Sequence, residues 1–324
     1  MRPGRRDRGG RRGRRRMTSE RDAARDSQAM APMRWEIGDI TVTRVMELPT
    51  MAMEPDDLLQ TTREVVARHD WLQPDYVTPD LLLRANIQAF VIEAGGKRIM
   101  VDPCVGNDKP REGQLFSMLQ TPFLERLAVA GYPRESIDFV LCTHLHFDHC
   151  GWNTMLVSGE WVPTFPNARY LFARAEYACA TKPEGEEEAA VYRDSVRPVM
   201  AAGLVDLVDP LHEIVSGVRL EPSPGHTPGH CCVTLDSRGQ TAMITGDAIH
   251  HPLQAAEPDI CSLYCWDKTL AVASRKSILE IASITGATLF GSHFPEPTAV
   301  RVRKAATGWR MDGVRGVRGS ATSE

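Results

Sequence analysis

Two features that mark particular classes of protein are missing from this chain of 324 residues. No apolar run reaches the roughly 18 residues of a membrane-spanning helix, so we expect no membrane span and no membrane partner. The eight cysteines include no CxxC pair, which argues against a disulfide framework and against a cysteine-rich zinc knuckle. Free thiols are typical of a reducing compartment, and we therefore predict a cytoplasmic location.

Charge is distributed unevenly along the chain. Residues 1–16 hold nine Arg and one Asp, a net charge of +8, so the rest of the chain carries −12. This stretch is rich in Gly and Arg and has no apolar segment, which predicts a disordered tail over residues 1–32 and argues against an export signal. Such a tail could bind nucleic acid or an anionic membrane, or be a dispensable extension upstream of Met17. The acidic body disfavours nucleic acid as a substrate.

Length and a hydrophobic content of 42% allow one large α/β domain, which we place at residues 33–311, with a polar tail over 312–324. Apolar alternation predicts a strand pair over 35–48 and a hairpin of 87–93 with 97–102. Further strands are expected at 137–141, 169–172 and 288–290, and strands at 204–207, 218–220, 231–235 and 242–245 are expected to complete a second sheet. Helices are expected at 56–69, 115–130, 191–202 and 266–285. The first of these could form a flap over a site or dock on the surface.

The segment 144–149 reads His-Leu-His-Phe-Asp-His, and it follows the apolar run 137–141, which is typical of a buried strand. It therefore occupies the loop at the carboxyl end of that strand, where α/β folds hold their ligands. Four of its side chains can bind a metal: His144, His146, Asp148 and His149. The first two point the same way in an extended segment, and a turn would direct the last two to a second point nearby. One loop could thus supply two metal ions.

The remaining motif residues follow glycines, in the order Gly225-His226, Gly246-Asp247 and a final loop with His293. With the HxHxDH segment before them, these motifs resemble those of the metallo-β-lactamase superfamily. The loop His-Leu-His-Phe-Asp-His is similar to that of acyl-homoserine lactone lactonases and methyl-parathion-type hydrolases, in a resemblance that covers about residues 85–300.

The resemblance implies a four-layer αββα sandwich and a site for two divalent metal ions, with zinc favoured. His144, His146 and His226 would hold one ion, and Asp148, His149 and His293 the other. Asp247 would bridge them. A hydroxide shared by the ions would attack a small lactone, ester or phosphotriester, so the chain is expected to be a dinuclear metal-dependent hydrolase.

Other residues of the pattern have expected supporting roles. The resemblance implies that Asp102, at the end of a strand, buttresses the metal loop, and that His230 packs behind the ligands. The chain departs from the lactonases at Cys150-Gly151-Trp152, and at His250, where they carry a Tyr. We predict Asp148 and His250 as catalytic residues. A bulky pocket rim is expected from Trp152, His250, His251, Trp266 and Phe294.

Alternative functions share the same ligands. A glyoxalase II-like thioesterase would need a basic glutathione site, for which Arg301, Arg303 and Lys304 are candidates. A nuclease usually carries an extra domain or arm, which the stretch from Asp247 to His293 leaves little room for. The expected partner is a small-molecule substrate, and a homodimer is compatible with the sequence.

Overall fold

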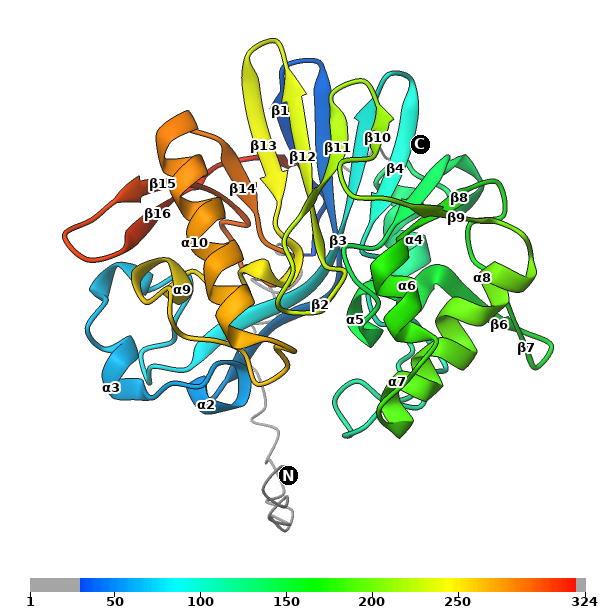
Figure 1. The fold of residues 1–324 in the computed structure, drawn as a ribbon, viewed down its shortest axis with the longest axis horizontal. Helices are drawn as coiled ribbons and strands as arrows, with labels where there is room; N and C mark the ends of the chain where they lie inside the picture. The colour runs from blue at the N-terminus through cyan, green and yellow to red at the C-terminus, as the bar shows by residue number, and fades with distance from the viewer. Residues whose placement is uncertain (1–29, 319–324) are drawn as a thin grey trace.

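The computed structural model describes residues 30–318, and the tail positions 1–29 and 319–324 lie outside the described residues. Two β-sheets pack face to face, and helices cover the outer face of each (Figure 1). This is the αββα sandwich expected from the sequence. Among residues 30–318, no helix is long and apolar enough to cross a bilayer.

The first sheet has eight strands in the order β17-β1-β2-β3-β4-β5-β8-β9. Their bounds are β1 Met33–Ile37, β2 Ile40–Met53, β3 Leu83–Ala94, β4 Lys97–Val101, β5 Phe139–Leu141, β8 Arg169–Ala173, β9 Val205–Val208 and β17 Val317–Arg318. The second sheet has seven strands in the order β10-β11-β12-β13-β14-β15-β16. These are β10 Glu213–Val215, β11 Val218–Pro222, β12 Cys231–Ser237, β13 Gln240–Ile244, β14 Thr288–Phe290, β15 Ala299–Lys304 and β16 Trp309–Val314. A separate hairpin joins β6 Thr154–Val157 to β7 Glu160–Pro163.

The described helices are mostly short. They are α2 Pro55–Leu58, α3 Arg63–Val66, α4 Phe123–Val129, α5 Phe147–Cys150, α6 Arg174–Ala180, α7 Glu186–Val191, α8 Arg197–Ala201, α9 Leu253–Ala256 and α10 Lys268–Thr285. A π-helical turn, Tyr192–Val196, joins α7 to α8, and 3₁₀ turns cover Asp70–Leu72, Arg134–Ser136, Gly151–Asn153 and Gly246–Ala248.

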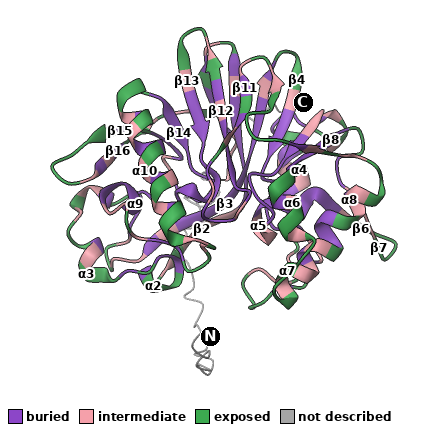
Figure 2. Ribbon diagram, in the orientation of Figure 1, coloured by how far each residue is buried: buried purple, intermediate pink, exposed green. Residues whose placement is uncertain are grey.

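Three apolar cores separate the four layers. The central core lies between the sheets and includes Phe90, Val233 and Phe290. A second core packs α4 and the α7–α8 region on the first sheet, and a third packs α9, α10 and the segment after β2 on the second sheet. The central strands are mostly buried, and exposed residues gather on the outward faces of the helices, in the loops and on the edge strands (Figure 2). Buried strands of this kind make rigid supports for the loops at their ends.

Local sequence explains the best-formed elements. The turn between β3 and β4 is Gly95-Gly96, with φ of 58° and 72°, a conformation that two-residue hairpins require and that glycine adopts without strain. Helix α10 begins after Asp267, whose carboxylate accepts hydrogen bonds from the backbone N–H groups of Thr269 and Leu270. It ends at Gly286, with φ of 73°. The hairpin and the helix confirm the predictions for 87–102 and 266–285.

Two predicted helices are wrong in extent. The span 56–69 breaks into α2 and α3, because Leu59 pairs with Ser262 and the Gln60 N–H donates to the Cys261 carbonyl. The segment is docked and is not a free flap, since Leu59 and Leu72 are fully buried. The span 115–130 is helical only over α4, and Leu115 is 54% exposed. Pairing with distant segments decides where these helices begin and end, and the local periodicity of apolar residues does not reveal such pairing.

The sheets also extend beyond the predicted limits. Strand β9 pairs in parallel with β8 in the first sheet, so the span 204–207 does not belong to the second sheet. Strands β16 and β17 include residues 312–314 and 317–318, which were expected to lie in a polar tail. At the other end, the Ala31 carbonyl accepts a hydrogen bond from the buried Arg44. Alternation in these short, polar strands is too weak to be recognised before their partners are known.

The order of parallel strands brings the motif segments together. Strand β5 pairs in parallel with both β4 and β8, and β13 pairs in parallel with β14. Parallel neighbours end at the same edge of a sheet. The segments that follow β4, β5, β13 and β14 therefore meet at one edge of the sandwich, and these segments carry the predicted ligands except His226.

A buried charge cluster fixes the loop between β4 and α4. Lys109 is fully buried, donates from Nζ to Thr154 Oγ1 at 2.8 Å and lies 3.6 Å from the centre of the Trp161 ring. Asp194 Oδ1 is 3.7 Å from Lys109 Nζ, while Arg111 makes two hydrogen bonds to the same carboxylate at 2.7 and 2.9 Å. Two cations thus share one carboxylate, and burial lowers the pKa of Lys109 to about 8 despite the attraction of Asp194.

This pKa predicts a change of stability with pH. An unfolded Lys titrates near pH 10.4, so between about pH 8 and 10 the unfolded chain binds a proton that folded Lys109 does not. The free energy of unfolding should therefore rise with pH in this window, with Lys109 adding up to about 1.4 kcal/mol per pH unit. Urea unfolding at pH 8 and pH 10 measures it, with Lys109→Met as the matched control. An equal pH dependence in both proteins would contradict the prediction.

Candidate metal centre

The metal loop leaves β5 and turns into α5 beside a buried carboxylate, Asp102. Asp102 follows β4 with φ of 52°, a conformation that Asp tolerates better than most residues. Its Oδ1 accepts the backbone N–H of Thr143 at 2.7 Å, and its Oδ2 accepts the Thr143 hydroxyl at 2.9 Å. Oδ2 also accepts from His149 Nδ1 at 2.9 Å. Asp102 therefore holds both ends of the loop, as the resemblance implied.

Three imidazoles form the first group of donors. His144 Nε2 is 3.1 Å from His146 Nδ1, and His226 Nε2 is 2.9 Å from the same atom. Nitrogen ligands about 2 Å from one metal ion lie roughly 3 Å from one another. The three nitrogens therefore have the spacing of ligands to a common ion, and the three residues form a group that could hold one.

The second group combines a carboxylate with two imidazoles. Asp148 Oδ1 is 3.8 Å from His149 Nε2, and Asp148 Oδ2 is 3.6 Å from His293 Nε2. These three residues also form a group that could hold an ion. Asp148 is only partly buried, whereas His149 and His293 are buried. The centre is thus open to solvent on the side of Asp148.

Asp247 lies between the two groups and presents one oxygen to each. Its Oδ1 is 3.2 Å from His149 Nε2 and 3.1 Å from His293 Nε2. Its Oδ2 is 3.3 Å from His226 Nε2 and 3.9 Å from His144 Nε2. Asp247 could therefore contact an ion held by either group. The structure brings together all seven residues that the motifs singled out.

Hydrogen bonds on the outer nitrogens decide how the imidazoles face the centre. His149 Nδ1 contacts the carboxylate of Asp102, and His293 Nδ1 contacts the carbonyl of Asn86 at 3.0 Å. Both partners can only accept, so each Nδ1 carries a hydrogen and each Nε2 is directed at the centre. Both Nε2 atoms face Asp247 Oδ1, and neither His149 Nε2 nor Asp247 Oδ1 has a hydrogen-bond partner. The buried carboxylate needs positive charge beside it, from protons on these rings or from metal ions, and this set of imidazole and carboxylate donors fits divalent metal ions.

The charges around the centre lead to the same conclusion. Burial and the neighbouring imidazoles lower the pKa of His144 well below its ordinary value, so it is a neutral donor. For His149, burial is outweighed by the carboxylates of Asp247, Asp148 and Asp102, which raise its pKa well above the ordinary value. The three carboxylates therefore demand positive charge at His149, which is where a cation would supply it.

His230 supports Asp247 from behind. Its Nε2 accepts the backbone N–H of Asp247 at 3.0 Å, so the proton lies on Nδ1, which contacts Ser223 Oγ at 2.8 Å. Burial lowers the pKa of His230 to about 4, which keeps the ring neutral. The sequence predicted a packing or supporting role for this residue, and its contacts are of that kind.

His250 lies inside the cluster. Its Nε2 is 3.2 Å from Asp247 Oδ2, its ring centre is 4.8 Å from that of His226, and it is buried. Together with His226 and Asp247 it forms a further group that could hold a metal.

The predicted aromatic rim is only partly present. Trp266 is 57% exposed, but Trp152, His251 and Phe294 are buried.

The buried rim candidates have structural partners instead. Trp152 stacks on Phe123 with ring centres 5.6 Å apart and donates from Nε1 to Glu47. His251 Nε2 contacts the carbonyl of Tyr76 at 3.0 Å, which docks the segment before β3. The expectation for Trp152 and His251 as rim residues is therefore wrong, because a polar atom on each ring finds a buried partner.

Sequence reasoning missed three buried polar residues that hold the ligand loops. Gln88 Nε2 donates to the carbonyls of Gly291 and Phe294 at 2.8 and 2.9 Å, and the Asn86 carbonyl accepts from His293. Glu176, on α6, accepts hydrogen bonds from the loops of His146 and His226. Polar residues within buried strands, as at Asn86 and Gln88, were the available signal for the first two.

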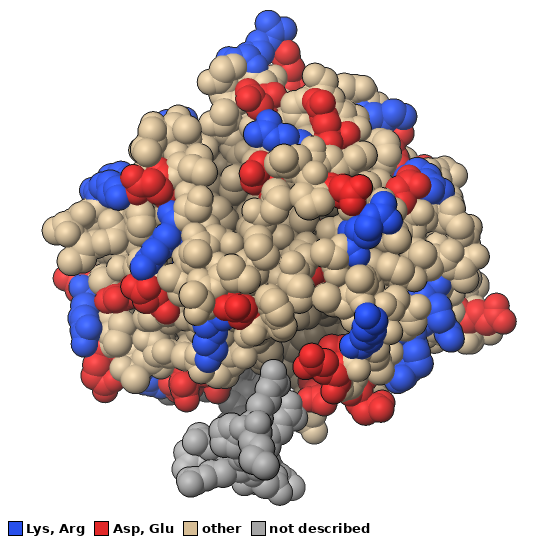
Figure 3. Space-filling view, viewed as in Figure 1, with Lys and Arg blue, Asp and Glu red and all other residues tan. Residues whose placement is uncertain are grey.

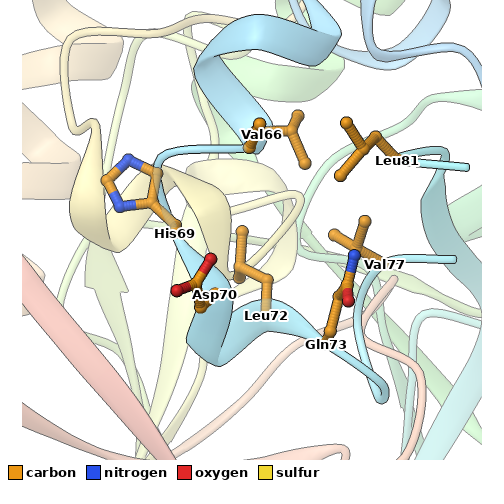
Figure 4. Close-up of a pocket in the computed structure, with 8 residues that line it drawn as sticks. Val66, His69, Asp70, Leu72, Gln73, Val77 and Leu81 are labelled. Carbon is orange, nitrogen blue, oxygen red and sulfur yellow. The ribbon is translucent and has the colours of Figure 1, made fainter. Parts of the chain in front are cut away.

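A small cavity lies apart from this centre. It has a volume of about 70 Å³ and is lined by Val66, Leu72, Val77 and Leu81, together with His69, Asp70 and Gln73 (Figure 4). None of the predicted ligands lines it. Its size suits a few water molecules, so it is not a substrate site.

The chain is similar to known proteins over the region that carries the centre. The model of the metallo-beta-lactamase superfamily matches residues 84–293. An N-acyl homoserine lactonase of Bacillus cereus is 26% identical over 232 residues, which cover 67% of this chain and 84% of that lactonase.

Solved structures share the fold. AidC, a dizinc quorum-quenching lactonase in complex with a product, N-hexanoyl-L-homoserine, is 20% identical with a TM-score of 0.74, over 89% of this chain and 99% of AidC. The hydrolase AbOPH, in the beta lactamase superfamily, is 24% identical with a TM-score of 0.70, over 88% of this chain and 98% of AbOPH.

Removal of the central carboxylate tests the metal assignment. Asp247→Ala takes away the oxygens that face both groups, so bound cations would repel each other with less compensation. We expect the rate of hydrolysis to fall by several orders of magnitude and the metal content to drop. Metal analysis of the purified variant beside the wild type measures this. Two retained metal ions with a near-normal rate would show that the assignment is wrong.

Proposed function

The chain belongs to the metallo-beta-lactamase superfamily and is a metal-dependent hydrolase, and we propose that it opens small lactones with two divalent cations, zinc being favoured. Simple esters and phosphotriesters are further candidate substrates for the same hydrolytic chemistry. The observation that supports the proposal is that His149 Nε2 and His293 Nε2 both face Asp247 Oδ1, at 3.2 and 3.1 Å. The similarity to N-acyl homoserine lactonases supports the lactone.

The residues have separate roles in this reaction. Two divalent cations in such a centre supply Lewis acidity and lower the pKa of water enough to provide hydroxide near neutral pH. Asp247 keeps its negative charge between the two donor groups, because the surrounding histidines lower its pKa well below the ordinary value in spite of burial. Ring opening releases an alkoxide that needs a proton. We assign this proton transfer to the carboxylate of Asp148, which is only partly buried.

Apolar side chains flank the opening. Phe147, in the metal loop, packs on Phe116 with ring centres 5.3 Å apart. On the other side, Cys265 Sγ is 3.7 Å from His226 Nδ1, which places the exposed Tyr264 and Trp266 beside the centre. Such an entrance favours an uncharged substrate with an apolar substituent.

The alternatives are less well supported. Of the basic residues considered for a glutathione site, Arg303 is paired with Asp312 and Lys304 with Glu280. On the face of the described chain that Figure 3 shows, Lys and Arg side chains are interspersed with Asp and Glu, whereas a nucleic-acid groove gathers positive charge. A nuclease usually carries an extra domain or arm, and the segment from Asp247 to His293 is instead occupied by α9, α10 and β14.

The substrate class can be tested directly. Chelation of the purified protein should abolish activity, and zinc should restore it. The reloaded protein is assayed on an acyl-homoserine lactone, an aryl ester, a phosphotriester and S-lactoylglutathione by proton release or chromophore formation. We expect the highest kcat/KM on the lactone. A higher value on the thioester would favour the thioesterase, and full activity without metal would refute the proposal.

His250 tests the departure from the lactonase pattern. Neither of its ring nitrogens has a hydrogen-bond partner in the described structure, so one can donate to a substrate oxygen, as a Tyr would. His250→Phe should lower kcat by about 10²-fold or less and leave two metal ions bound. His250→Tyr should retain more activity on lactones than His250→Phe. Equal rates for all three proteins would make His250 a bystander, and loss of a metal ion in His250→Phe would make it a ligand.

A further inference from the structure

Glu176 occupies a position that no ligand motif includes. It lies on α6, is 5% exposed, and makes no ion pair among residues 30–318. Its carboxylate is instead compensated by hydrogen bonds from two loops that are far apart in the sequence. A buried carboxylate is costly unless donors surround it, so these contacts define what the residue does.

The contacts connect the two loops that carry the first donor group. Oε1 accepts the backbone N–H of Leu145, the residue between His144 and His146, at 3.0 Å. Oε2 accepts the hydroxyl of Thr227, the residue after His226, at 2.7 Å and the backbone N–H of Gly229 at 3.1 Å.

Close packing leaves this arrangement little freedom. A Cβ atom at Gly229 would lie 2.2 Å from the backbone nitrogen of Glu176, so α6 rests directly on the loop of His226. A second link joins the loops where the Cys231 N–H donates to the Thr143 carbonyl at 3.0 Å. With the loops held in this way, His226 Nε2 lies 2.9 Å from His146 Nδ1.

We propose that Glu176 is a positioning residue that clamps the loops of His146 and His226 and thereby sets the affinity for one of the two cations, the one held by His144, His146 and His226. This inference rests on the two-cation centre of the proposed function. The second donor group depends on other supports. Asp102 holds His149, the Asn86 carbonyl holds His293, and Gln88 holds the loop of His293. Asp102 also holds Thr143, beside His144, whereas the hydrogen bonds of Glu176 go to the loops of the first group, so Glu176 acts on the first site.

The chemistry of the contacts selects the substitution. Glu176→Gln keeps the shape of the side chain but replaces one acceptor oxygen by an NH₂ donor. Whichever way the amide is turned, its NH₂ faces a buried backbone N–H, of Leu145 or of Gly229, and the clamp is broken on that side. Glu47→Gln is the matched control, because Glu47 is also buried and accepts hydrogen bonds from neutral donors, but from Val105, Gly106, Thr121 and Trp152.

Zinc titration of the metal-free proteins, with calorimetry or a competing chelator, tests the proposal. For Glu176→Gln we expect the Kd of one zinc ion to rise by about 10- to 100-fold while that of the other stays within about threefold of wild type. Excess zinc should restore most of kcat. Glu47→Gln should lose thermal stability and keep both Kd values.

Three results would overturn the clamp: unchanged zinc affinities in Glu176→Gln, equal weakening of both ions, or a loss of kcat that excess zinc does not repair. If Glu176 had only a structural role, Glu176→Gln and Glu47→Gln would both have a lower melting temperature and zinc binding would stay intact. That is the first of these results. Fewer than two zinc ions on the wild-type protein would instead refute the proposed function on which the clamp rests.

Discussion

Negative charge buried at the centre is the constraint on which the rest of the structure depends. His149 Nε2 and His293 Nε2 both face Asp247 Oδ1 across about 3 Å. Without protons or metal ions between them, the imidazole lone pairs and the buried carboxylate would repel each other, so the loops that carry them must be held. Buried polar groups outside the donors hold them in place, and Asp102, with contacts to Thr143 and His149, is the clearest case.

The sandwich makes such restraint possible. Parallel pairing of β4 with β5 and of β13 with β14 brings four chain segments to one edge, and three apolar cores keep the strand ends rigid. Each loop then needs only one or two side-chain supports. The supports are polar residues with complete hydrogen bonding, as His230 shows with Ser223 on one nitrogen and the Asp247 N–H on the other. Stability of the fold and preorganisation of the centre are therefore properties of the same contacts.

We propose that specificity is set where the chain departs from the lactonase pattern. His250 Nε2 lies 3.2 Å from Asp247 Oδ2 and brings an imidazole to the first donor group. Trp152 is buried, stacks on Phe123 and donates to Glu47, so its bulk is not available to contact a substrate. Phe116 packs on Phe147 of the metal loop, and the exposed Tyr264 and Trp266 come just before α10.

The sequence by itself determined the candidate donor residues, their order and the α/β class. Metal-binding side chains crowded into 144–149, with glycines before His226 and Asp247, form a pattern that a loop without a bound metal has no physical reason to contain. Strong local signals, such as Gly95-Gly96 and the Asp267 cap, also located their elements. Only the tertiary structure decided which oxygen of Asp247 faces which group, that 56–69 breaks into two docked helices, and that Glu176 joins two loops. These depend on pairing between segments far apart in the chain, and neither periodicity nor spacing records such pairing.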